Sequence, residues 1–570
     1  MFDFGLSSID FAILGLYLIG ITALGIWAGR KIHNTEDFFM GGRRFRKTMM
    51  LFFSFGAGTH SDQAVSVAAK TYTNGLSGIW YQWLWLFSTP FYWMIAPIFR
   101  RMRALTTADY FALRYAKSVA SLFAFLGILQ IIVNMATMLK GSGAMITAVT
   151  GGTVNEVWAV GIMTVLFVTY GIVGGLRAAI LTDFIQGMLT VVLSFLLLPF
   201  ALHAVGGMAG LREKVSDPAM FQLIAPGDIT AFYIAVISLN ALIGIVTQPH
   251  VMPICAAGKT ELDNRIGFTY GNFLKRICTV AWTFVGLCAI AMFPGMTEQA
   301  QIDQTFGLMA HRLLPLIAPG LIGLFLASML AAVMSTCDAL MISASALFTE
   351  NIYKPYFAPN KPQAHYVFVG RLVAGVIVAV SICVTLFYLE GVIHGLETFW
   401  IIQALMGIAF WVGLFWRRAT AAAAWASTVA AFVAALLAAN AFPALFDMDR
   451  FAVNYLPSFM VHDGAFRLPF QMLTYLAVGF VTIVVVSLFT RRAPAEKLDR
   501  LYRCLRTPIQ ENETPRHPFD YPTQAQPTQA KKIIDHPDFE LTMPGRETMI
   551  GFLVAWGIVG LIIGVVYGIV

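Results

Sequence analysis

Long apolar runs separated by short polar connections dominate this chain. Since about 20 apolar helical residues cross a bilayer, these runs predict an all-α polytopic membrane protein with about fourteen transmembrane helices. The predicted spans are 9–28, 48–72, 77–98, 118–147, 157–174, 178–204, 229–254, 268–293, 317–347, 366–389, 395–416, 419–441, 467–490 and 547–569.

One predicted span carries a polar face at its centre. Within 317–347, Ala332, Ser335 and Thr336 share one helix face, and Asp338 follows Ser335 by three residues. A carboxylate in hydrocarbon needs a partner or a water-filled cavity. Hydroxyls beside a carboxylate suit a small hard cation, although serine and threonine also pack membrane helices by bonding their own backbone. Both interpretations stay open on spacing alone.

Two other spans are interrupted by polar residues, prolines or glycines. Residues 54–63 contain Gly56, Gly58 and six polar side chains, and span seven contains Thr247–Gln248–Pro249–His250. Unwound backbone at membrane depth is tolerated where it lines a cavity, and its carbonyls can bind cations. The glycines could instead only allow close helix contact. Breaks in spans two and seven are the pattern expected of a five-plus-five inverted repeat.

Composition and charge agree with a membrane protein. The 570 residues are 58% hydrophobic and 12% charged, with a formal net charge of +7. Basic residues follow the odd-numbered spans, which predicts that those connections are cytoplasmic and that both termini lie outside. They include Arg30, Lys31, Arg43, Arg44, Arg100, Arg101, Arg177, Lys259, Lys354, Arg417, Arg418, Arg491 and Arg492. We expect a multi-pass protein of the cell (plasma) membrane that binds no nucleic acid.

The predicted organisation has three parts. Residues 1–490 form the main transmembrane region, with a first helix at 9–28, a ten-helix core over about 48–416 and additional helices at 419–490. Residues 491–546 form a cytoplasmic linker, whose proline-, glutamine- and threonine-rich part favours an extended tether. Residues 547–570 form a last helix, whose Gly560, Gly564 and Gly568 predict close packing on a neighbour. The six scattered cysteines indicate neither a disulfide framework nor a metal cluster.

Several motifs together resemble the sodium:solute symporter family, in particular its sodium/glucose cotransporter-like members. They occur in the family's order and span most of residues 9–490. The resemblance implies the leucine-transporter type of fold and sodium as the coupling ion, with no other cofactor. The motifs are Phe38–Arg43, Tyr170–Ala178, Thr182–Gln186, Phe273–Lys275, Ala331–Thr336, Ser343–Ser345, Phe348–Lys354 and Gly413–Trp416.

The same resemblance implies a sodium site. The family's unwound first core helix contributes two carbonyls, which correspond to Gly56 and Thr59. Its eighth core helix contributes a carbonyl and two hydroxyls, which correspond to Ala332, Ser335 and Thr336. Gly56 replaces the usual alanine, which a backbone ligand tolerates.

A second ion is a further implication of the resemblance. Some members bind another sodium with an aspartate that corresponds to Asp183 and with hydroxyls at positions that are Asp338 and Ala339 here. The two aspartates could hold a second cation jointly. Alternatively one of them stays protonated, because nearby carboxylates disfavour each other's ionisation.

The substrate is expected to be a small polar organic solute. Aromatic rings and carboxamides favour a sugar or polyol, and sugar-transporting members resemble the chain at Asp62–Gln63, Gln248 and Lys275. A carboxylate or amino acid held by Lys275 or His60 stays open. Trp80 and Trp85 are expected to be interfacial anchors. The candidate substrate residues are His60, Asp62, Gln63, Trp83, Asn240, Gln248, Lys275, Trp400 and Gln403.

Other function classes remain as alternatives to a sodium symporter. We find no metalloprotease, serine hydrolase or nucleotide-binding motif, so we do not expect an enzyme. A proton-coupled carrier would use Asp183, Asp338 or His60 as the titrating group. A sensor derived from a transporter is a further alternative. The expected partners are the solute, sodium and the bilayer, and no obligatory protein partner is inferred.

Overall fold

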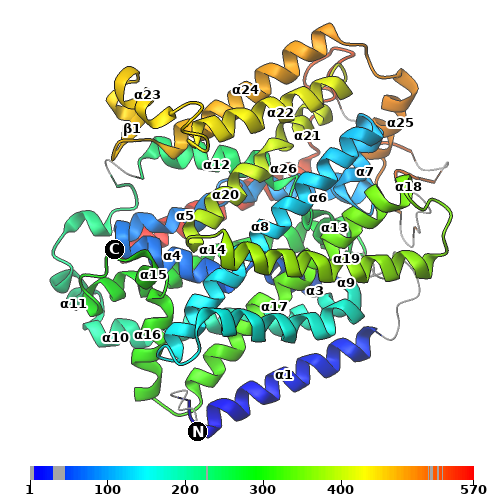
Figure 1. Cartoon of the computed structure of the whole chain (residues 1–570). Coiled ribbons are helices and arrows are strands. Elements are labelled where there is room, and N and C mark those ends of the chain that lie inside the picture. Colours follow the sequence, from blue (N-terminus) through cyan, green and yellow to red (C-terminus); the bar gives the residue numbers. More distant parts are fainter. Residues whose placement is uncertain are drawn as a thin grey trace.

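The fold is built almost entirely of helices (Figure 1). The computed structural model describes residues 6–29, 45–225, 229–510, 513, 518–522, 526–528 and 531–570, without the side chains of 28, 29, 166, 167 and 169–178. The motif at 38–43 and the basic residues Arg30, Lys31, Arg43 and Arg44 therefore lie outside the described residues, as do the side chains of Tyr170–Ala178.

Ten stretches of helix in the described part of the chain are long and apolar enough to cross a membrane. α1 begins and α26 ends toward the same end of the bundle (Figure 1). The helices that carry these stretches are α1 (Ser8–Gly29), α8 (Lys117–Val149), α9 (Glu156–Leu196) with α10 (Leu198–Val205), α14 (Glu261–Met292), α17 (Leu321–Phe348), α19 (Gln363–Phe387), α20 (Val392–Leu405) with α21 (Gly407–Phe415), α22 (Ala421–Ala438), α24 (Leu468–Phe489) and α26 (Arg546–Ile569).

Three other predicted spans consist of shorter helical pieces. Span two is α3 (Lys47–Gly58) and α4 (Ser61–Asn74), span three is η2 (Gly75–Ile79), α5 (Trp80–Trp83) and α6 (Thr89–Arg101), and span seven is α12 (Ala231–Ile245) and α13 (Val251–Ala256). Thr59 and His60 adopt extended backbone, so the expected break in span two falls at these residues and separates α3 from α4. The break in span seven contains Pro249, which cannot donate a helix hydrogen bond.

Spans five and six differ from the prediction of two helices. The backbone stays helical from Glu156 to Leu196, and α10 follows directly. Gly174 and Gly175 weaken a helix but do not stop it, and α9 contains no proline. Helical backbone is thus present at all of the predicted spans, although it is not divided into fourteen separate helices.

α17 is the most enclosed of these helices. Its apolar stretch is completely buried, and it packs against α9, α8, α1, α19 and α3. α14 packs along α3, and its Gly267 and Gly271 make the close approach possible. A Cβ atom at Gly267 would lie 2.8 Å from the carbonyl oxygen of Met50, and one at Gly271 would lie 2.7 Å from that of Leu51. These contacts fix the broken span between α14 and α17.

The remaining elements are short. The described strands are a two-residue antiparallel pair, β1 (Val461–His462) and β2 (Ala465–Phe466). The short helices are α7 (Thr107–Arg114), α11 (Gly207–Lys214), η3 (Pro218–Phe221), α15 (Gln299–Ile302), α16 (Thr305–Leu313), η4 (Leu314–Leu316), η5 (Thr349–Tyr353), α18 (Lys354–Tyr356), α23 (Met448–Tyr455), η6 (Ser458–Met460) and α25 (Ala495–Arg506).

The segment 491–546 is packed rather than extended in its described part. α25 lies against α7, where Lys497 Nζ donates to the carbonyl oxygens of Ala112 and Tyr115 at 3.1 and 2.8 Å. Tyr502 donates from its hydroxyl to the carbonyl oxygen of Gly413 on α21 at 2.7 Å. α25 has apolar residues on one face and buries them, whereas the proline-rich stretch for which composition predicted a tether lies partly outside the described residues.

A carboxylate holds the later part of this segment. The Glu540 side chain is 2% exposed and accepts hydrogen bonds from Arg417, at 2.5 Å, and from Arg506. Trp416 and Phe539 form a β-bridge beside this contact. The segment therefore joins the end of α21 to the end of α25.

The last helix packs through a glycine other than those expected. A Cβ atom at Gly551 would lie 2.3 Å from the indole of Trp93 on α6, so α26 contacts α6 at this point. A Cβ atom at Gly560, Gly564 or Gly568 would have no neighbouring atom within 4 Å, so the close packing predicted for these three glycines is wrong.

Replacing Glu540 with Gln removes the charge that Arg417 and Arg506 share. Since these arginines are partly exposed, we expect a loss of about 2–3 kcal/mol. Opening of residues 531–543 should become roughly 30- to 150-fold more frequent, as measured by amide hydrogen exchange. Glu496→Gln, at an exposed position of α25, is the matched control. Equal exchange in both variants would contradict the arrangement.

Candidate functional site

The end of α3 meets the centre of α17 through a direct hydrogen bond. Thr336 donates from its hydroxyl to the carbonyl oxygen of Gly56 at 2.8 Å and lies 3.3 Å from that of Ala332. Because α3 ends at Gly58, its last carbonyls lack regular helix partners. The Gly56 carbonyl also accepts from the Thr59 amide at 3.4 Å. Two carbonyls and a hydroxyl thus gather at one point.

A carboxylate from α9 lies beside this contact. Ser335 donates from its hydroxyl to Asp183 Oδ1 at 2.6 Å, while Asp183 Oδ2 is buried without a hydrogen-bond partner. Asp338 also interacts electrostatically with Asp183. Thr59 is fully buried, and its hydroxyl has no partner. This oxygen-rich group has the ligand chemistry that a small hard cation requires.

Two further residues at this group were not predicted from the sequence. Gln186 of α9 donates through Nε2 to the hydroxyl of Tyr17 at 3.2 Å. Tyr17 belongs to α1 and interacts electrostatically with Asp338 and Asp183. A tyrosine in an apolar first helix gives no signal that it approaches a site formed by α9 and α17. Gln186 could have been found as a polar residue within an apolar span.

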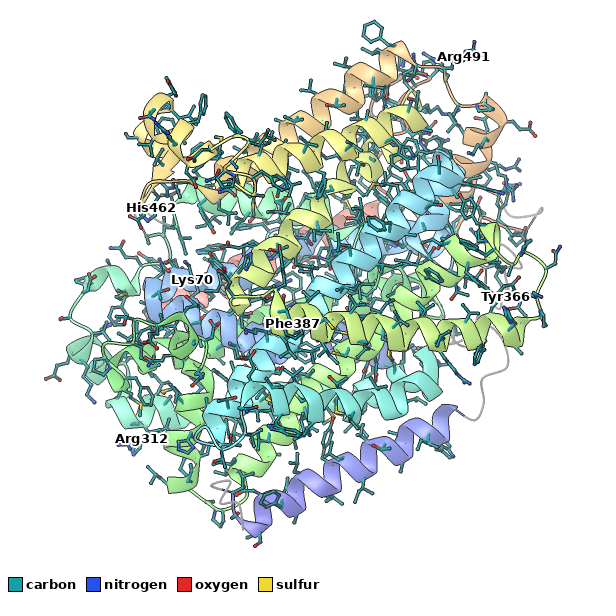
Figure 2. All side chains as sticks on the ribbon, viewed as in Figure 1. Lys70, Arg312, Tyr366, Phe387, His462 and Arg491 are labelled. Atoms are coloured by element: carbon teal, nitrogen blue, oxygen red, sulfur yellow. The ribbon has the colours of Figure 1, made fainter. Side chains whose placement is uncertain are left out.

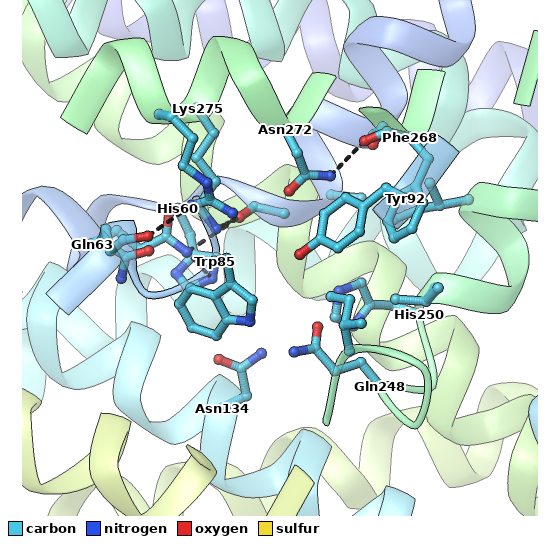
Figure 3. A pocket seen from close by; sticks show the side chains of 18 of the residues that line it. His60, Gln63, Trp85, Tyr92, Asn134, Gln248, His250, Phe268, Asn272 and Lys275 are labelled. Carbon is cyan, nitrogen blue, oxygen red and sulfur yellow. Dashed lines mark hydrogen bonds between the residues drawn. The ribbon is translucent and has the colours of Figure 1, made fainter. Parts of the chain in front are cut away.

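A cavity also borders the α3–α4 break (Figure 3). The break contributes His60 to its polar lining, and α14 contributes Asn272, Lys275 and Arg276. Its lining residues are Ser54, Ala57, Gly58, His60, Gln63, Gln82, Trp85, Tyr92, Asn134, Ile245, Gln248, His250, Val251, Ile254, Phe268, Asn272, Lys275, Arg276, Leu396 and Phe399.

His60, Asp62 and Gln63 form one hydrogen-bonded group at the cavity. His60 Nδ1 contacts Asp62 Oδ1, and Gln63 Nε2 lies 2.9 Å from His60 Nε2. Gln63 Nε2 also donates to the carbonyl oxygen of Gly58 at 3.2 Å, which identifies this atom as the amide nitrogen. The Gln63 amide and the Asp62 carboxylate thus hold the two ring nitrogens of His60, Nε2 and Nδ1.

α14 brings two cationic side chains to the cavity. Lys275 Nζ donates to the carbonyl oxygen of Gly58, and Arg276 Nη1 donates to that of Gln82 at 3.0 Å. Lys275 Nζ and Arg276 Cζ lie 5.5 and 5.7 Å from the ring centroid of Trp85. Figure 3 shows the Trp85 ring between Lys275 and the amides of Asn134 and Gln248.

The structure brings only some of the candidate substrate residues to the cavity wall. His60, Gln63, Gln248 and Lys275 line it. Two others contact lining residues: Asp62 pairs with His60, and Gln403 Oε1 accepts from Gln248 Nε2 at 2.5 Å.

The three remaining candidates lie in the surrounding packing. Asn240 bridges the carbonyl oxygen of Trp400 and the hydroxyl of Tyr475, at 3.0 and 2.7 Å. Trp83 donates from its indole to the carbonyl oxygen of Arg276 at 3.1 Å. Trp400 is fully buried beside Tyr81 and Trp85.

Other lining residues were missed or interpreted differently. Trp80 and Trp85 are 4% and 5% exposed, so neither is the interfacial anchor expected from the sequence, and Trp85 lines the cavity. Asn134 and Asn272 lie within predicted spans, and their position in an apolar helix was the available signal.

Comparison with known proteins identifies relatives of the chain. The sequence model of the sodium:solute symporter family matches residues 38–430. A sodium/glucose cotransporter from Vibrio parahaemolyticus is 25% identical over 477 residues, which are 76% of this chain and 86% of that protein. A sodium/proline symporter from Haemophilus influenzae is 25% identical over 526 residues, covering 88% and 97% of the two chains.

A solved structure shares the fold. The outward-open, substrate-bound form of a Na⁺-coupled sialic acid symporter superposes with a TM-score of 0.71, covering 86% of this chain and all of that one. The two sequences are 19% identical. The expected fold class is thus supported by an experimental structure of a transporter.

The contact between Gly56 and Ser335 can be tested by adding one methyl group. A Cβ atom at Gly56 would lie 2.7 Å from Ser335 Oγ, so Gly56→Ala should displace that hydroxyl from Asp183. We expect a stability loss of about 1–3 kcal/mol in thermal unfolding. The loss should be much smaller in a Ser335→Ala background, where the obstructing oxygen is absent. Gly15→Ala, in open surroundings, is the control, and equal losses in both backgrounds would contradict the contact.

Proposed function

Because the chain belongs to the sodium:solute symporter family, we propose that it is a sodium-coupled symporter importing a small polar organic solute by alternating access. The observation that carries this proposal is the Thr336–Gly56 hydrogen bond. This bond joins α3, which ends at the break beside the cavity, to α17, whose apolar stretch is buried and which carries the oxygen ligands.

The proposed sodium ligands are the carbonyls of Gly56, Thr59 and Ala332 and the hydroxyls of Ser335 and Thr336. The short distances among Gly56, Ala332 and Thr336 support this assignment. Sodium would replace the Thr336–Gly56 hydrogen bond by coordination and would draw Ser335 toward the same point. A carbonyl and hydroxyl set provides the hard oxygen atoms that this ion prefers.

This arrangement also suggests how the ion couples to the solute. Sodium between α3 and α17 would hold the break in span two in one position, and the same break lines the cavity. An ion shifts a conformational equilibrium only through different affinities for the two states. Inward opening would therefore separate Gly56 from Thr336 and release both ligands.

Asp183 and Asp338 are proposed to hold a second cation. Their electrostatic interaction and the partnerless Oδ2 atom of Asp183 support this role. The competing function is a proton-coupled carrier, in which one of these aspartates would take up the proton.

The substrate is proposed to bind in the cavity, at His60, Gln63, Gln248 and Lys275, with Asp62 and Gln403 behind them. Aromatic and amide groups favour a sugar or polyol, and a relative named for glucose supports this preference. A relative named for proline supports the alternative of a carboxylate or amino acid. Trp83, Asn240 and Trp400 would act on the substrate only through residues that they position.

The membrane topology is proposed from charge. Fourteen spans with a five-plus-five repeat would leave both termini on the non-cytoplasmic side and residues 491–546 in the cytoplasm. In Figure 2, Arg491 and Tyr366 lie toward one end of the bundle, and Arg312 and His462 lie toward the other. Arg491 and Tyr366 mark connections that follow odd-numbered spans. Their common position supports a cytoplasmic assignment for that end of the bundle.

Removing both proposed hydroxyl ligands should abolish sodium binding. We expect Ser335→Ala with Thr336→Ala to lower the affinity for radioactive sodium, measured on the purified protein, by at least about 100-fold. Ser345→Ala is the control, because that hydroxyl bonds only to its own helix, at Ile342. Unchanged sodium binding in the double variant would rule out this site.

Neutralising Asp338 should reduce the number of bound ions. For Asp338→Asn we expect sodium binding to saturate at about half the wild-type stoichiometry, since a second cation loses its charged ligand. The measurement is equilibrium sodium binding at several pH values. Full stoichiometry together with a lost pH dependence would instead identify a proton carrier.

A further inference from the structure

The charge of the cavity indicates which kind of solute it accepts, given the function proposed above. All lining residues are described, and none of them is Asp or Glu, whereas Lys275 and Arg276 are both present. These two side chains are 7% and 1% exposed. A buried cation is costly unless an anion compensates it.

One acidic side chain lies directly behind the lining. Asp62 is bound to His60 through Nδ1. Lys275 Nζ donates to the Gly58 carbonyl rather than to Asp62. The lining therefore carries two basic side chains and no carboxylate of its own.

Several hydrogen-bond donors at the cavity lack partners. The Nε atom of Arg276, the indole nitrogen of Trp85 and the amide nitrogen of Gln82 are buried without a hydrogen-bond partner, as are the acceptors Gln63 Oε1 and Gln82 Oε1. An ammonium has three donors, and one of them at Lys275 is used by Gly58. Buried donors without partners are uncommon in proteins, and a ligand or an ordered water can supply the acceptors.

We propose that the solute is a small carboxylate with an uncharged hydroxylated or amide-bearing body. Its carboxylate binds at Lys275, beside Arg276 and the indole of Trp85. Its body lies against the amides of Gln63, Gln248 and Asn134, which donate to and accept from hydroxyl or amide groups.

A neutral sugar would satisfy the amides but would leave Lys275 and Arg276 without an anion in the cavity. A carboxylate satisfies both, because it neutralises the charge and accepts several hydrogen bonds at once. The sugar-like and carboxylate preferences derived from the sequence are therefore compatible in one molecule.

The test compares acids with alcohols of the same shape. The full-length protein is melted in detergent at a fixed sodium concentration with four pairs: glucuronate and glucose, gluconate and sorbitol, pantothenate and pantothenol, and lactate and propane-1,2-diol. We expect the acid of at least one pair to raise the melting temperature by several degrees and its alcohol to have little effect. Lys275→Gln should weaken that acid's apparent affinity about tenfold or more.

Two variants control for folding and for charge. Lys275→Arg should retain most of the affinity for the acid, and Lys214→Gln, at an exposed position of α11, should leave it unchanged. The inference would be overturned if the alcohols raised the melting temperature as much as the acids. It would also be overturned if the effect of an acid persisted in Lys275→Gln, or if no acid had an effect. Stabilisation by sodium alone, measured on the same samples, reports separately on the proposed symport.

Discussion

The interruption of one helix at Thr59 and His60 is the constraint on which both candidate sites depend. A continuous helix would bond every carbonyl internally, and none would be available at membrane depth. Because α3 stops at Gly58, the Gly56 carbonyl turns to Thr336 of α17 and the Gly58 carbonyl turns to Lys275 of α14. Two carbonyls separated by a single residue therefore connect the oxygen-rich group to the cavity. A shift of the backbone between Gly56 and Gly58 therefore changes the oxygen-rich group and the cavity together.

The surroundings of the break keep it in position. α14 presents glycines where the backbone of α3 approaches, and α17 is enclosed on all sides by other helices. Such close packing has few intermediate arrangements, so a displacement of α3 is expected to occur as a discrete step. The buried side chains of Thr336, Lys275 and Gln63 find acceptors in backbone carbonyls at the break.

The sequence predicts those elements whose evidence lies in neighbouring residues of the chain. The long spans, the break at residues 54–63 and the polar face of α17 all follow from hydropathy and from polar residues in apolar runs. It could not find contacts made by distant parts of the chain, such as Tyr17 of α1 beside Gln186 of α9. It also misjudged Trp85, because an aromatic residue near a helix end looks the same whether lipid or a cavity surrounds it. The proline-, glutamine- and threonine-rich part of 491–546 lies partly outside the described residues, so the tether expected there stays a prediction.

The packing of the last helix and of the segment before it limits which truncations and insertions the protein tolerates. Gly551 admits the Trp93 indole with no room for a larger residue, and Glu540 compensates two arginines that belong to different parts of the chain. A shortened gene ending before residue 491 would expose Trp93 and leave Arg417 without its carboxylate. The C-terminal eighty residues are therefore expected to be inherited as one unit with the helices they cover, and insertions should be tolerated elsewhere, in exposed connections such as that between α23 and β1.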